Sequence, residues 1–114
     1  MTIDQSKLFT IPRGDVFPIY VYLRDANDAP ITLVGKSIIL IVKKKLNDPD
    51  ETATILKTVS SHTNAALGQS LINLTPTDTE VTDSGLFQAE FQVVAGTDPT
   101  TFERAFFQFK QDVV

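Results

Sequence analysis

Histidine and cysteine, on which most nucleophilic and metal-binding sites depend, are almost absent from this chain. The 114 residues include one histidine, His62, and no cysteine. His62 stands in a polar stretch of serine, threonine and asparagine, where we expect an exposed loop residue and not a catalytic base. The missing cysteines exclude disulfides, thiol catalysis and zinc fingers, and a zinc or copper site is not expected from a single histidine.

Carboxylates offer the remaining route to a reaction or a metal site. Asn47, Asp48, Asp50 and Glu51 form a dense group of side-chain oxygens. The segment lacks the glycine and the closing glutamate of an EF-hand loop. No two acids stand out as a glycosidase pair, and there is no phosphate-binding loop, dinucleotide-binding turn or nucleophile elbow. We therefore expect no catalytic residue, no metal site, no cofactor and no enzymatic activity.

Two short motifs have plainer structural explanations than ligand binding. Arg13-Gly14-Asp15 spells the tripeptide that integrins recognise, but it lies between two apolar segments, where its residue types favour a turn. Lys43–Lys45 is the one basic run, and because no aromatic residues alternate with the lysines, it is interpreted as a strand end. The net charge of −4 has the wrong sign for phosphate contacts, so we expect no nucleic-acid partner.

The strands and turns that would position any site residue belong to a chain of globular composition. Hydrophobic residues make up 42% of the sequence and charged residues 21%, which argues against a disordered protein. This length supports one hydrophobic core, so we expect a single domain over residues 1–114, with a short flexible N-terminal segment over residues 1–7. No apolar run reaches the roughly 20 residues of a membrane span, and the first residues do not form a signal peptide. We expect no membrane contact.

Apolar residues recur at every second position, which is the period of β-strands, and turn residues separate the runs. The predicted strands cover residues 8–12, 16–24, 37–45, 54–61, 70–74, 85–94 and 101–112. A single helical turn is predicted at 75–80, with Thr75 as its N-cap and Pro76 as its first residue. Seven short strands predict an all-β fold, an immunoglobulin-like β-sandwich of about seven antiparallel strands. A small β-barrel produces the same pattern and is the alternative.

The alternation also predicts an outer surface that carries aromatic side chains. In strand 16–24 the tyrosines face away from the core, and in strand 101–112 Phe107 and Phe109 face the core, so their even-numbered neighbours face outward. This is more exposed apolar surface than small monomers usually show, and aromatic residues often anchor protein interfaces. The predicted interface residues are Tyr20, Tyr22, Phe102, Arg104 and Phe106. Loops that cover these residues, or a β-bulge that reverses the register, are the alternative.

Several short motifs follow one another in a defined order. Arg13–Phe17 begins a strand, Asp25 closes it, and Pro30–Gly35 leads into the next strand. Leu74–Thr79 then precedes Gly85–Phe87. This order resembles the N-terminal domain of the phage baseplate upper protein family, whose relatives are small immunoglobulin-like tail and virion modules of tailed bacteriophages. The motifs cover about two thirds of the chain.

The sequence departs from these patterns at specific positions. The resembling modules often have glycine where Asp28 and Ala29 stand. Residues 83–89 are similar to the immunoglobulin Asp-x-Gly-x-Tyr-x-Cys stretch, but Phe87 replaces the tyrosine and Ala89 replaces the cysteine. The resemblance therefore implies a sandwich with an apolar corner, without the tyrosine hydroxyl bond and without an inter-sheet disulfide.

The resemblance implies a domain that attaches to other virion proteins and carries no reaction. We therefore expect a structural virion protein of a tailed phage or prophage, in the tail, baseplate or fibre-attachment region. Its partners would be other virion proteins and further copies in a homo-oligomer that buries the outer apolar face. It would be made in the bacterial cytoplasm and located in the virion. A capsid decoration (cement) protein is one alternative; a host-surface or carbohydrate-binding module, with Tyr20 and Tyr22 stacking on sugars, is another.

Overall fold

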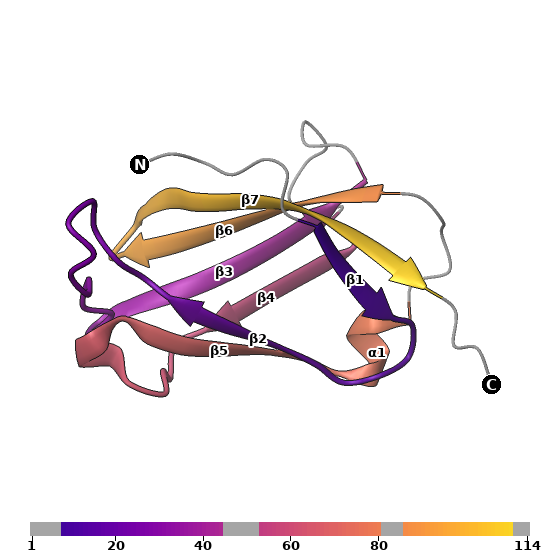
Figure 1. Cartoon of the computed structure of the whole chain (residues 1–114), viewed down its shortest axis with the longest axis horizontal. Helices are drawn as coiled ribbons and strands as arrows, with labels where there is room; N and C mark the ends of the chain where they lie inside the picture. The colour runs from indigo at the N-terminus through magenta and orange to yellow at the C-terminus, as the bar shows by residue number, and fades with distance from the viewer. Residues whose placement is uncertain (1–7, 45–52, 81–85, 111–114) are drawn as a thin grey trace.

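Two β-sheets pack face to face in the computed structural model, which describes residues 8–44, 53–80 and 86–110 (Figure 1). The larger sheet has five strands in the order β1 (Leu8–Pro12), β7 (Asp98–Lys110), β6 (Leu86–Ala95), β3 (Lys36–Lys43) and β4 (Ile55–Val59). The smaller sheet pairs β2 (Phe17–Tyr22) with β5 (Gln69–Leu74). A 3-10 turn, η2 (Ala65–Leu67), precedes β5, and α1 (Pro76–Thr79) follows it.

The distribution of strands between the sheets is that of an immunoglobulin sandwich. β3, β6 and β7 share one sheet while β2 and β5 form the other, as strands C, F and G are separated from B and E. β4 lies beside β3 in the larger sheet, which is the arrangement of the variable type. The predicted all-β, immunoglobulin-like sandwich is therefore confirmed, and the barrel alternative is wrong.

One strand pairing differs from the predicted antiparallel arrangement. β1 pairs with β7 in parallel, with Leu8 opposite Phe106 and Pro12 opposite Lys110. After Pro12 the chain crosses to the other sheet, so β1 cannot form a hairpin with β2. It lies instead against β7, which runs in the same direction. Residue alternation carries no information on strand direction, which is why the sequence did not indicate this pairing.

The core lies between the sheets, and aromatic rings fill much of it. Phe87 and Ala89, which stand where the immunoglobulin stretch has tyrosine and cysteine, are each 1% exposed. The Phe87 ring meets the Phe109 ring edge-on at a centroid distance of 5.5 Å, and the Phe107 centroid lies 6.3 Å from that of Phe109. Aromatic packing therefore occupies the corner where the immunoglobulin pattern has a tyrosine hydroxyl bond.

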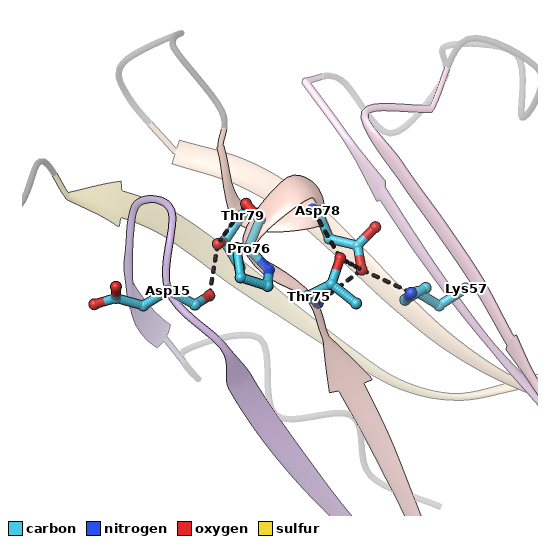
Figure 2. Close-up of polar contacts among 6 residues, drawn as sticks. All are labelled: Asp15, Lys57, Thr75, Pro76, Asp78 and Thr79. Carbon is cyan, nitrogen blue, oxygen red and sulfur yellow. Dashed lines mark hydrogen bonds and ion pairs between the residues drawn. The ribbon is translucent and has the colours of Figure 1, made fainter.

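The helical turn α1 connects the two sheets through side-chain contacts (Figure 2). Thr75 is its N-cap and Pro76 its first residue, as predicted, and Asp78 completes a capping box with Thr75. Lys57 of β4 lies 2.7 Å from the Asp78 carboxylate. On the other side, the buried Thr79 hydroxyl donates to the Asp15 carbonyl at 2.7 Å. The turn at Arg13-Gly14-Asp15 is therefore tied to α1.

We expect the Lys57–Asp78 contact to make stability depend on pH in acid. Burial alone raises the pKa of Asp78, but hydrogen bonds from Lys57 and Thr75 outweigh burial and hold that pKa below its ordinary value of 3.8. The stabilisation is therefore complete when the pH is above the ordinary pKa. It is lost as the pH falls through the lowered pKa of the folded state. Asp78→Asn should cost about 1 kcal/mol or less at neutral pH. Urea unfolding of both proteins between pH 7 and pH 2 checks this, because their stabilities should converge in acid; a constant difference would contradict it.

Candidate protein–protein interface

The outer face of the larger sheet combines exposed apolar side chains with a central polar band. Strand alternation sends Phe87, Ala89 and Phe91 of β6 into the core and the even-numbered residues outward. The registers of the neighbouring strands bring further outward residues beside them. We call this set the five-stranded outer face; it consists of Leu8, Ile39, Ile41, Lys43, Leu56, Leu86, Gln88, Glu90, Gln92, Arg104 and Phe106.

Apolar side chains lie on both edge strands of this face and at the start of its central strand β6. Leu8 is 51% exposed, Leu56 56% and Leu86 53%. Phe106 lies between Leu8 and Gln88 in the register and is half-buried. Ile41 lies between Glu90 and Leu56, and its side chain is only 4% exposed. A surface with several leucines exposed at about half of their area is suited to close contact with another protein.

The polar band in the middle of the face contains an ion pair. Arg104 Nε lies 3.6 Å from Glu90 Oε1, and Gln92 Nε2 donates to Glu90 Oε2 at 3.3 Å. Glu90 is 17% exposed and Arg104 39%. Arg104 Nε is buried and has no hydrogen-bond partner, because 3.6 Å is too long for one. Such a charge pair between apolar edges can fix the orientation of a partner more than it raises the affinity.

Tyr20 and Tyr22 lie on the opposite side of the molecule, on the outer face of the two-stranded sheet. They are 63% and 60% exposed, while Ile19 and Val21, which alternate with them along the strand, are buried. The predicted orientation of strand β2 is therefore confirmed. The five predicted interface residues do not form one surface, because β2 and β7 belong to different sheets.

The prediction that Phe102 faces outward is wrong. Phe91 lies opposite Glu103 and Gln92 lies opposite Thr101, so Phe102 is the extra residue of a β-bulge. The bulge turns the Phe102 ring toward the core, where its centroid lies 6.1 Å from that of Phe91. Only Arg104 and Phe106 of the three predicted β7 residues therefore belong to the outer face.

The bulge also forms one wall of a cleft of about 670 Å³. Its apolar lining comes from Leu23, Ile31, Val93 and Phe102. Its rim includes Asp25, whose Oδ1 accepts hydrogen bonds from two backbone amides of the same loop, at 2.9 and 3.0 Å. In this loop Asp28 has a φ of +63°, a left-handed conformation that glycine adopts more readily than other residues. No sequence signal indicated this cleft.

His62 is not the exposed loop residue that the sequence suggested. It is half-buried, and its ring joins the two sheets by contacting Lys36 O at 2.7 Å and Ser70 Oγ at 2.8 Å. A carbonyl can only accept, so Nε2–H donates to Lys36 O, and in the neutral ring Nδ1 accepts from the Ser70 hydroxyl. Both ring nitrogens are occupied, which leaves neither for a substrate.

The remaining predictions concern the carboxylate cluster, metal sites and membrane contact. The cluster Asn47–Glu51 lies outside the described residues. Within residues 8–44, 53–80 and 86–110, no three histidine, aspartate or glutamate side chains gather as metal ligands would. In those same ranges, no helix has the length and apolar character needed to cross a membrane.

Comparison with known proteins found solved structures that are similar to this chain. No protein-family model matches the chain, and no curated protein matches its sequence. A solved structure titled "Tim-1" is similar over 98% of this chain and 98% of its own, with 10% sequence identity and a TM-score of 0.47.

Proposed function

We propose that this chain is a non-enzymatic structural protein that assembles with other proteins through the five-stranded outer face. The supporting observation is that Leu8, Leu56 and Leu86 are half-exposed on the face that also carries Phe106. Burying these side chains in an interface removes apolar area from water, and the Arg104–Glu90 pair then orients the contact.

The setting that we propose is the virion of a tailed phage or prophage, in its tail, baseplate or fibre-attachment region. The support is the order of the motifs between residues 13 and 87, which resembles the phage baseplate upper protein family. Virion structures repeat one subunit many times, so the same face would serve copies of this chain arranged around a closed axis, or a neighbouring virion protein.

The proposal predicts that Phe106→Asp disrupts assembly while the fold remains intact. The substitution places a carboxylate on the face between Leu8 and Gln88, where its desolvation opposes burial against a second chain. Native mass spectrometry over a concentration series should show a discrete closed oligomer for the wild type and nothing larger than a dimer for Phe106→Asp. Leu56→Asp should behave in the same way, because it lies on the same face.

A matched control is Val34→Asp, which adds the same charge at a loop position that is 65% exposed and outside the face. It should assemble as the wild type does. Circular dichroism establishes that each variant is folded. A folded Phe106→Asp protein that forms the wild-type oligomer would refute the proposed face. A wild type that stays monomeric at high concentration would refute its use between copies of this chain.

A carbohydrate-binding module is a second candidate, favoured by the exposed rings of Tyr20 and Tyr22. Two aromatic side chains two residues apart on one strand face can stack on neighbouring sugar rings. Titration against a glycan array tests this function: saturable binding that Tyr22→Ala abolishes would support it, and the absence of saturable binding would exclude it.

A further inference from the structure

β2 is an edge strand whose alternate residues turn their backbone groups away from the sheet. Leu23, just after the strand, donates its N–H to Gly68 O at 2.8 Å, so it faces the β5 side. Hydrogen-bonding direction alternates along an antiparallel strand, so Ile19 and Val21 also face β5. Pro18, Tyr20 and Tyr22 therefore direct their backbone groups to the open edge.

Hydrogen bonds on the other side of β5 confirm which residues of β2 turn their backbone groups toward β5. Gln69, which lies opposite Tyr22, exchanges two backbone hydrogen bonds with Asn64, at 2.9 and 3.1 Å. Its backbone groups therefore point away from β2, as those of Tyr22 must also point away from β5. Among the described residues β2 pairs with β5 alone, which leaves the backbone N–H groups of Tyr20 and Tyr22 without partners.

This edge carries little of the protection that natural sheet edges usually have. No charged residue occurs in Phe17–Tyr22 or in Gln69–Leu74. Exposed edges are commonly protected by charged side chains, by proline or by covering elements. Here Pro18 is the one protective residue of the strand, and it removes a single donor.

We propose that β2 pairs antiparallel with β2 of a second copy, across a two-fold axis at Tyr20. This deepens the proposed function, on which it rests, by naming a second copy as one partner. With the axis at Tyr20, the outward N–H and C=O groups of the two Tyr20 residues exchange two hydrogen bonds. On either side, Tyr22 N–H donates to Pro18 O of the other copy, so the missing donor of Pro18 falls at the ends of the pairing.

The sequence of β2 is self-complementary about this axis. Tyr20 meets its own copy on the outer face, and each Pro18 meets a Tyr22, giving ring-to-ring pairs. Between them Ile19 lies opposite Val21, so two β-branched residues face each other across the axis. A two-fold axis brings each charge near it close to an identical charge, and the uncharged strand avoids that repulsion. A second copy therefore fits this edge better than an unrelated charged strand does.

The experiment uses Phe106→Asp chains, in which the five-stranded outer face no longer assembles. We expect sedimentation velocity to show a weak dimer that forms as concentration rises. Adding Tyr20→Lys places two ammonium groups opposite each other and should weaken the dimer at least about tenfold. Tyr20→Glu should weaken it equally. Mixing the Lys and Glu variants in equal amounts should restore dimers, because opposite charges then meet at the axis.

Val34→Lys in the same background is the matched control, and it should dimerise as the background does. Tyr20 is 63% exposed, so its substitutions should leave the fold intact, which circular dichroism checks. If Phe106→Asp chains do not fold, Leu56→Asp provides the background. A background that is monomeric at the highest concentration, a dimer unaffected by Tyr20→Lys, or a mixture that stays monomeric would each overturn the β2 pairing. A different result would show that the proposed function is wrong. In that case the Phe106→Asp substitution would leave the wild-type oligomer unchanged.

Discussion

Replacing Gly68 with alanine is expected to destabilise the protein by about 3 kcal/mol or more, from left-handed backbone strain of about 1–2 kcal/mol together with a steric clash. Gly68 is buried and has a φ of +68°. An added Cβ would lie 2.5 Å from Ile31 O and 2.6 Å from Leu23 O. Both contacts are with backbone atoms, so no side chain can move aside. The substitution would also disturb the 2.8 Å bond between Leu23 N and Gly68 O.

Gly35→Ala is the matched control for this prediction. Gly35 has a similar φ of +73°, but nothing lies within 4 Å of its Cβ position. This variant should lose only the left-handed backbone strain, about 1–2 kcal/mol. Urea unfolding of the two variants separates the clash from the strain, and equal losses in both would contradict the close approach at Gly68.

His62→Ala is expected to cost about 2–3 kcal/mol, because it leaves buried hydrogen-bonding groups unsatisfied. Ser70 is 2% exposed, and its hydroxyl would lose the acceptor Nδ1. Lys36 O would lose the donor Nε2–H, and with it the link between the starts of β3 and β5. Urea unfolding measures the loss.

A double-mutant cycle with Ser70→Ala tests whether this loss comes from the bridge. The two substitutions should show a coupling of about 1 kcal/mol, since each removes one side of the same hydrogen bond. Ser61→Ala, at the exposed neighbour of His62, is the control and should change stability by less than about 0.5 kcal/mol. Additive effects of His62 and Ser70 would show that the bridge does not contribute to stability.

Much of the fold follows from the spacing of residues along the chain. The alternation in β2 correctly placed Ile19 inside and Tyr20 outside, because each strand buries one face. The cap at Thr75 and the first helical residue Pro76 were also predicted correctly, since both depend on chemistry within one turn of chain. Local patterns therefore fixed strand positions and faces.

Features that depend on distant residues were not predictable in this way. Phe102 turns inward because a bulge adds one residue to β7, and no glycine or proline stands there to indicate it. His62 makes its two bonds to residues 26 and 8 positions away, on different sheets. The split of the predicted interface between two faces depends on which sheet each strand joins, and alternation does not specify this.

The parallel pairing of β1 with β7 determines how the fold would resist mechanical tension. A force that pulls Leu8 and Lys110 apart acts along both strands and slides them past each other in opposite directions. The hydrogen bonds between the strands lie across that force, so they share the load and must break together. An antiparallel pair pulled open from one end would yield one bond at a time. The β1–β7 contact is therefore the mechanical clamp of this molecule, and a chain under tension between these ends would be held by it first.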